Sequence, residues 1–366
     1  KKWYGTRVHQ ARALLQMLAW VDHPAATQTL LAVGTRFRTK SLQEEATKLA
    51  QAIAERKGWS LAELADRTIP SAGLDDDGML TLDFGPRQFS ARLDAAMNLV
   101  LLDPEGKTIK TLPDPRKDDD AEQAAAAKKQ LAATRKELKQ VLDQQRINFH
   151  EAMCVQRTWR FEDWQPFLCL HPIVRHFCQR LVWNALRGEQ VLHFRPLADG
   201  SFTDVDDNPV TLEPTDMISL AHQTTVSADA AKAWLQHLSD YEIAPLFDQF
   251  GRSAPEITSE TKKQRELKDF EGWMSDTFKI RGRATKLGYT RGSTGDGGWF
   301  NEYIKRFPTT GLVAVIEFTG SSLPEEQIPA ALTKLTFRRD NGTQSSPDLP
   351  LSEVPSVLLT ECWNDY

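Results

Sequence analysis

DDAEQAAAAKKQLAATRKELKQVLDQQRINFHEAMCVQR, residues 119–157, is the stretch that decides how this 366-residue chain folds. From Arg116 to Gln165 the chain has neither glycine nor proline, so no residue there favours a break in a helix. Apolar residues recur at threes, fours and sevens, the spacing of one helical face: Ala124, Ala127, Leu131, Leu138, Leu142, Phe149 and Met153. The pattern predicts a single helix over about 119–157, about 60 Å long at 1.5 Å per residue.

The apolar face of this helix has two possible partners. It is either the seam of a coiled-coil dimer or a spine that packs against its own domain. The spine is favoured, because Arg135 and Gln145 interrupt the stripe. The acidic run Asp118–Asp120 lies where negative charge favours a helix start.

Residues 1–70, at the start of the chain, carry the pattern of helical hairpins. Val8, Ala11, Leu15 and Leu18 share one helical face, and Pro24 suits the first position of the following helix. Helices joined by a short turn are typical of the end of a HEAT-type solenoid, although any helical bundle has the same pattern. The HEAT interpretation predicts further repeats before residue 1, since a lone repeat cannot bury its own face.

In residues 71–115 the spacing of apolar residues changes to every second residue, the pattern of β-strands. Apolar residues alternate with polar ones around Leu80 and Phe89, and turns are expected at Gly85-Pro86 and Pro104–Gly106. We expect a small antiparallel meander of about four strands.

Residues 116–366 are predicted to form the long helix and a C-terminal α+β domain with an antiparallel sheet, because helices and strands do not alternate regularly. The helices are expected at about 161–187 with a break at 171–172, 228–240, 259–287 with a break near 272, and 351–363. The strands are expected at 191–196, 202–205, 210–212, 217–221, 299–307, 311–318 and 334–339.

Composition limits the class of protein. The net charge of -5 argues against a nucleic-acid binder by bulk charge, although a local basic patch remains possible. Cys154, Cys169 and Cys178 are expected as buried thiols in a reducing compartment. No apolar run approaches the roughly 20 residues of a membrane span, so we expect a cytoplasmic protein without a membrane partner. The opening Lys1–Tyr4 suggests part of a longer polypeptide, whose missing N-terminal part would be a partner.

The familiar catalytic signatures are absent: the chain has no GxSxG, HExxH, Walker A, CxxC or GxGxxG sequence. No cofactor is therefore predicted. Two groups resemble metal sites at first sight. Cys169, His171, His176 and Cys178 could ligate zinc, but a helix-capping His171 and core cysteines are favoured. The Asp204–Asn208 run could ligate calcium, but a hairpin turn is favoured, and no metal site is predicted.

The segment Lys279–Phe307 is the candidate anion-binding region, with seven basic and two acidic residues. Guanidinium groups hold phosphate well, aromatic rings stack on bases, and a glycine-rich loop lets backbone N–H groups approach an anion. The candidate ligand-binding residues here are Arg281, Arg283, Lys286, Arg291, Gly297, Gly298 and Trp299, with Asp296 as a weak candidate general base. The alternative is a solvated basic helix face followed by a hairpin loop, with the aromatics in the core.

A second polar cluster comprises Arg175, Arg180, His193, Arg195 and Glu242. Arg175 and Arg195 are candidate ligand residues if the cluster converges on the basic loop to make a carboxylate or phosphate pocket. Ion pairs that join a helix to the sheet would explain these residues equally well.

Four stretches carry a family resemblance: Trp164–Trp183, Phe194–Pro196 with the Asp204–Val210 turn, Asp240–Gly251, and Gly295–Phe300. Over residues 75–366 the chain resembles the bacterial domain-of-unknown-function 4132 family. That domain is found at the C-terminus of large proteins, some with a WGR domain and some named as molybdate metabolism regulators. The resemblance implies no chemistry, and the WGR association hints at nucleic-acid-linked biology.

Two hypotheses of function follow. The first is a non-catalytic interaction or regulatory module that binds a nucleic acid or nucleotide through the basic segment. The second is an enzyme of unrecognised type acting on a phosphorylated or nucleotide-like ligand. An open basic surface would favour the first, and a closed pocket in which Asp296 faces the arginines would favour the second.

Overall fold

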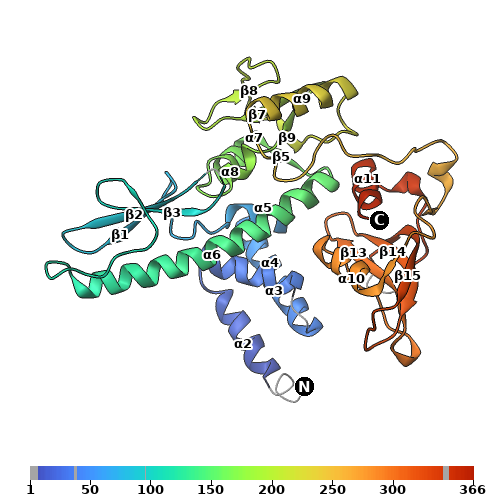
Figure 1. The fold of residues 1–366 in the computed structure, drawn as a ribbon, viewed down its shortest axis with the longest axis horizontal. Coiled ribbons are helices and arrows are strands. Elements are labelled where there is room, and N and C mark those ends of the chain that lie inside the picture. The colour runs from blue at the N-terminus through green and yellow to red at the C-terminus, as the bar shows by residue number, and fades with distance from the viewer. Residues whose placement is uncertain (1–6, 37–38, 95, 341–345) are drawn as a thin grey trace.

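The computed structural model describes residues 7–36, 39–94, 96–340 and 346–366. The opening Lys1–Tyr4 lies outside the described residues. The fold is α+β, with helices first, then a β-meander, a long helix and two further antiparallel sheets (Figure 1). Among the described residues, no helix is both long and apolar enough to cross a membrane.

The described part of the N-terminal segment contains the helices α2 Val8–Leu18, α3 Pro24–Arg36, α4 Lys40–Lys57 and α5 Leu61–Arg67. Pro24 occupies the predicted first position of α3, and Ser60 and Glu63 form a reciprocal capping box at the start of α5. Leu30 and Leu64 are fully buried in the small core that these helices share. The helices are confirmed, and the HEAT-type repeat stays a prediction.

The meander is confirmed strand by strand: β1 Met79–Asp83, β2 Gln88–Leu93, β3 Leu99–Leu102 and β4 Thr108–Ile109. The strand order is β1-β2-β3-β4, and all pairs are antiparallel. The inward-facing Leu80, Leu82 and Phe89 are buried, as the period-two pattern requires.

The long helix α6 spans Ala121–Cys154, and the Asp120 carboxylate accepts hydrogen bonds from two N–H groups at its start. Figure 1 shows α6 running from beside β1 to the neighbourhood of α11. Its apolar face is buried against the chain's own meander and central sheet, and even Gln145 is buried. The helix is therefore an intramolecular spine, as expected.

The central sheet has five strands in the order β5-β9-β6-β7-β8. They are β5 Thr158–Arg160, β6 Trp183–Arg187, β7 Gln190–Pro196, β8 Phe202–Thr203 and β9 Met217–Leu220. Trp183 and Phe194 pack in the core shared with α6, while α9, Ala228–Asp240, packs its Trp234 in a second cluster with Val182 and Ala221. The predicted strand at 210–212 is wrong, because this segment makes only isolated backbone contacts beside β8.

The predicted helix over 161–187 is also partly wrong. It is a series of short pieces followed by strand β6: α7 Phe161–Trp164, the π-helix η1 Gln165–Cys169 and α8 Arg175–Cys178. The first three residues of β6 are all buried, so the strand lacks the alternation of buried and exposed residues that distinguishes a strand from a helix.

The C-terminal sheet has six strands. Five follow the order β10-β15-β14-β13-β12, and the sixth, β11, also pairs with β15. They are β10 Glu266–Leu267, β11 Met274–Asp276, β12 Thr290–Arg291, β13 Phe300–Phe307, β14 Leu312–Ser321 and β15 Pro329–Arg339. Two helices, α10 Thr277–Lys286 and α11 Ser356–Asp365, contribute apolar side chains to the core of this sheet. The segment also contains three short 3-10 helices: η2 Thr261–Lys263, η3 Asp296–Gly298 and η4 Leu351–Glu353. The predicted helix over 259–287 is wrong except for α10, because residues 266–267 and 274–276 pair with β15 instead.

Candidate functional site

The basic segment Lys279–Phe307 comprises most of α10, then β12, η3 and the whole of β13. Arg281 and Arg291 converge there on a single carboxylate, that of Glu325 in the loop between β14 and β15. The Arg281 Nη1–Glu325 Oε2 distance is 2.7 Å, and the Arg291 Nη1–Glu325 Oε1 distance is 3.7 Å. The Glu325 side chain is only 7% exposed, whereas both arginine side chains remain about half exposed.

The other basic residues of the segment are dispersed. Arg283 and Lys286 are exposed on α10 without an ion pair among the described residues. Arg283 points about 200° around the helix from Arg281, since each helical residue advances by about 100°. Lys305 is partly buried, and its Nζ lies 3.0 Å from the buried Asp365 carboxylate. The predicted gathering of the guanidinium groups therefore includes Arg281 and Arg291 but not Arg283.

The glycine-rich loop positions Trp299. Gly297 and Gly298 both have left-handed φ angles, of 67° and 77°, and Gly298 accepts a backbone hydrogen bond from Leu323. The Trp299 ring lies against Gly320, where an added Cβ would come within 2.2 Å of the ring, yet Trp299 is 47% exposed. Trp299 was predicted as a ligand-binding residue, and the loop holds it at the surface.

Asp296, the weak candidate base, is exposed at the start of η3. Its carboxylate has no hydrogen bond or ion pair within the part of the chain that the structure describes. No contact connects it to Arg281 or Arg291, so the geometry does not give it the role of a base.

Further exposed apolar side chains lie at the same end of the sheet. They come from β11 and the residue before it, from α10 and from the β14–β15 loop. Thr277 N of α10 donates to Ile328 O of this loop, and Met274 of β11 pairs with Ala331 of β15, which follows the loop. We call this the sheet-end surface, and its members are Trp273, Met274, Phe278, Arg281, Arg291, Trp299, Leu323 and Ile328. Trp273 was missed because residues 259–287 were expected to form helix.

The second polar cluster does not reach this surface. The Arg175 guanidinium donates to the carbonyls of Asp76 and Asp77 beside the meander, and Arg180 donates to Ala244 O. Arg195 lies on β7, and its guanidinium group contacts His237 of α9. The predicted convergence of Arg175 and Arg195 on the basic loop is wrong, because these residues belong to elements that pack in other parts of the fold.

The two groups that resembled metal sites have structural roles: His171 caps a helix, and Asp204–Asn208 forms a turn. His171 Nδ1 accepts hydrogen bonds from the N–H groups of Ile173 and Val174, at 3.2 Å each. Burial lowers the pKa of His171 to about 4, so its imidazole is neutral. Asp204 Oδ1 accepts from the backbone of Asp206 and Asn208 in a tight turn. The described residues contain no group of three or more side chains arranged to hold a metal ion.

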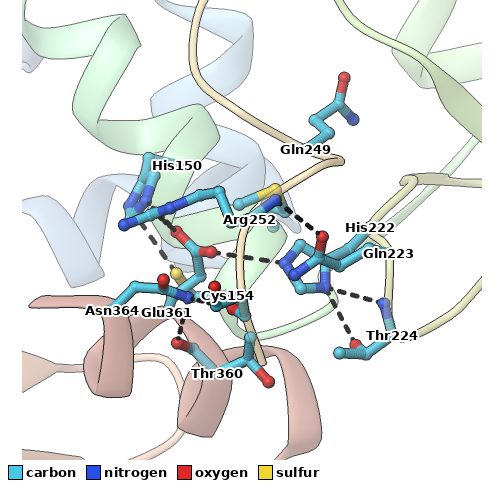
Figure 2. A network of polar contacts seen from close by, with 12 residues as sticks. His150, Cys154, His222, Gln223, Thr224, Gln249, Arg252, Thr360, Glu361 and Asn364 are labelled. Atoms are coloured by element: carbon cyan, nitrogen blue, oxygen red, sulfur yellow. Dashed lines mark hydrogen bonds and ion pairs between the residues drawn. The ribbon is translucent and has the colours of Figure 1, made fainter. Parts of the chain in front are cut away.

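A buried carboxylate network was missed entirely by the sequence reasoning. Figure 2 shows Glu361 of α11 between His150, His222 and Arg252. Glu361 Oε2 lies 3.0 Å from His150 Nε2 and 2.9 Å from Arg252 Nη1, and Oε1 lies 3.4 Å from His222 Nε2. No local sequence signal could have found it, because Glu361 and its three partners come from four separate segments.

The pKa of Glu361 reflects this environment. Burial alone would raise it, since the side chain is 1% exposed. Hydrogen bonds from His150 and His222 and the charge of Arg252 outweigh burial and lower the pKa to about 2. Glu361 is therefore ionised at neutral pH and holds α6, the segment after β9 and α11 together.

Cys154 lies next to His150 in the same network. Cys154, His150 and Glu361 therefore follow one another as a nucleophile, a base and a carboxylate do in a catalytic triad. The Cys154 Sγ lies 3.7 Å from His150 Nδ1. However, Cys154 is fully buried, and burial raises the pKa of its thiol well above the ordinary value. A buried thiol whose pKa is raised is a poor nucleophile, so the arrangement does not support a catalytic role for Cys154.

Comparisons with known proteins agree with the resemblance seen in the sequence. A family model described as "Domain of unknown function (DUF4132)" matches residues 106–289. The chain is 31% identical over 282 residues to the "Uncharacterized protein YehI" of Escherichia coli (strain K12). This alignment covers 75% of the chain but only 23% of that protein, so the chain spans about a quarter of this relative. No solved structure matches the chain.

Proposed function

We propose that this chain, which belongs to the DUF4132 family, is a non-catalytic binding module of a longer cytoplasmic polypeptide, and that its sheet-end surface binds single-stranded nucleic acid. The observation that carries the proposal is the convergence of Arg281 and Arg291 on Glu325, in the same basic segment that exposes Trp299.

The arginine pair supports the electrostatic half of the proposal. Glu325 balances one of the two positive charges, so the trio keeps a net charge of about +1. The same carboxylate orders both guanidinium groups, and the exposed half of each side chain is open to a phosphate. Arg281 also stacks over Phe278 at 4.6 Å, and Arg291 over Phe300 at 5.3 Å, which further limits their motion.

The exposed aromatic rings support the second part of the proposal, the stacking of bases. Trp273 is 60% exposed, and Phe278 is also exposed. Large exposed apolar side chains that gather on one surface commonly mark a binding site. Every base has a flat face, and stacking one on an aromatic side chain contributes about 1–3 kcal/mol without sequence preference. A surface with both arginines and exposed rings therefore fits an unpaired strand.

The enzyme hypothesis lacks this support. Asp296 makes no contact with the arginines, and the thiol of Cys154 is buried. Cavities of about 250 and 310 Å³ lie elsewhere, the first beside α2 and α4 and the second between α5 and β5.

Fluorescence anisotropy of a labelled oligothymidylate about 20 nucleotides long tests the proposal, at about 50 and 200 mM salt. We expect binding at low salt that weakens as salt rises. Trp299→Ala should weaken it about 5-fold or more through lost stacking. Arg291→Gln should weaken it and reduce its salt dependence.

Two matched controls keep the test specific. Trp20→Ala removes a tryptophan just after α2 that is even more exposed, at 83% against 47% for Trp299. Arg283→Gln removes the same charge from the other side of α10. Both should bind as the wild type does. Absence of binding at low salt, or equal losses for Trp299→Ala and Trp20→Ala, would overturn the proposal. If a free mononucleotide competes as well as the oligonucleotide, the surface is a nucleotide site and the strand proposal is wrong.

A further inference from the structure

Arg195 of β7 is a buried cation without a carboxylate partner. It is only 5% exposed, and no ion pair to it exists among the residues that the structure describes. Its Nε and Nη2 lie 3.4 and 3.3 Å from His237 Nε2, and its Nη1 lies 3.4 Å from the carbonyl of Pro196. All three contacts are at the long end of the hydrogen-bond range.

Such an environment is unusual for arginine. The guanidinium group stays charged in proteins, and buried charges are normally paired. Arg187, on the neighbouring strand β6, illustrates the ordinary case: it makes two hydrogen bonds of 2.8 and 2.6 Å to the buried Asp216. Burial lowers the pKa of Arg195, in agreement with the missing counter-charge.

Two side chains surround the Arg195 guanidinium group: His237 accepts hydrogen bonds from it, and the Tyr241 ring covers it. His237 Nδ1 lies 3.1 Å from Val205 O, which it can reach only as a donor, so Nε2 carries the lone pair that faces Arg195. The Tyr241 ring lies 5.6 Å over the guanidinium carbon and is half exposed on its other side.

The cover is held by one surface hydrogen bond. Tyr241 OH donates to Asp207 Oδ1 at 2.8 Å, and Asp207 is the middle of an exposed turn with a φ of 64°. Asp207 is also the nearest negative charge, 3.8 Å from His237 Nδ1, but it does not reach Arg195. Rotation of Tyr241 away from Asp207 would therefore uncover the guanidinium group.

We propose that Arg195 binds a small oxyanion, a phosphate group or a carboxylate, under a cover formed by Tyr241 and Asp207. The guanidinium has five N–H donors, of which three make the contacts above, and the remaining ones on Nη1 and Nη2 donate to the anion. The anion supplies the counter-charge that the fold leaves out. This site is separate from the sheet-end surface, and either proposal can fail without the other.

Equilibrium dialysis of the full chain against radiolabelled inorganic phosphate tests the site. We expect one phosphate per chain, lost in Arg195→Gln. Tyr241→Phe keeps the ring but releases the cover, so it should bind phosphate several-fold more tightly than the wild type. Arg160→Gln, which removes an exposed arginine from edge strand β5 of the same sheet, should bind as the wild type does.

The outcomes are distinct. If neither the wild type nor Tyr241→Phe binds phosphate or acetate, or if folded Arg195→Gln binds as the wild type does, the proposal is wrong. If Arg195→Gln does not fold, as judged by circular dichroism, the phosphate affinities of Tyr241→Phe and the wild type are compared instead. Equal affinities would show that Tyr241 does not cover the site, and the proposal would be wrong. Competition by acetate identifies a carboxylate ligand, and its absence identifies phosphate; either supports an oxyanion site.

Discussion

Replacing Glu361 by glutamine should destabilise the protein strongly at neutral pH. Glutamine has nearly the same shape and keeps one oxygen acceptor, so the substitution removes chiefly the charge. That charge is the only acidic group that His150, His222 and Arg252 share in the described structure. Removing one member of a buried ion network leaves its partners uncompensated.

The magnitude follows from the pKa of Glu361. It falls from the ordinary 4.5 to about 2, and each pKa unit corresponds to about 1.4 kcal/mol. The ionised carboxylate therefore contributes about 3 kcal/mol to the free energy of unfolding. Because the folded pKa is the lower one, this contribution is complete above about pH 4.5. It is lost as the pH falls towards about 2, since the unfolded chain takes up the proton first.

Urea unfolding followed by tryptophan fluorescence measures the effect at pH 7 and near pH 3. We expect Glu361→Gln to lose about 3 kcal/mol at pH 7 and clearly less near pH 3. Glu353→Gln is the control, because Glu353 forms an exposed ion pair with Arg339 and should change stability by less than about 1 kcal/mol. A loss at pH 7 no larger than the control's, or the same loss at both pH values, would refute this reasoning.

Two further predictions concern packing and thiol chemistry. Gly320→Ala should destabilise the C-terminal sheet by about 1–3 kcal/mol, because its φ is 100° and the new methyl group would collide with Trp299; an unchanged urea midpoint would contradict this. The cysteines should not react with a thiol reagent in the folded protein and should all react in denaturant, because all four are buried and burial raises the pKa of Cys169 and of Cys362 to about 12. Labelling of the native protein within minutes would show that this part of the core opens.

The candidate sites were predictable only to a limited extent. The basic segment was visible because its residues are close in the sequence, and two of its arginines do meet. Their common partner Glu325 lies on another loop, and no pattern in the sequence links it to them. Arg195 was identified as a candidate, but its burial and its cover by Tyr241 come from the packing of β7 against α9.

The sequence alone determined the elements whose signal is local. A stretch without glycine or proline and with one apolar face had to become α6, and alternation with turn residues had to become the meander. Only the tertiary structure decided that residues 183–187 are a strand and that residues 266–267 and 274–276 join β15, because backbone pairing with distant strands outweighs weak local preference. It also decided which charges are paired: Glu361 has three partners and Arg195 has no carboxylate among the described residues, since burial and proximity are properties of the packed chain.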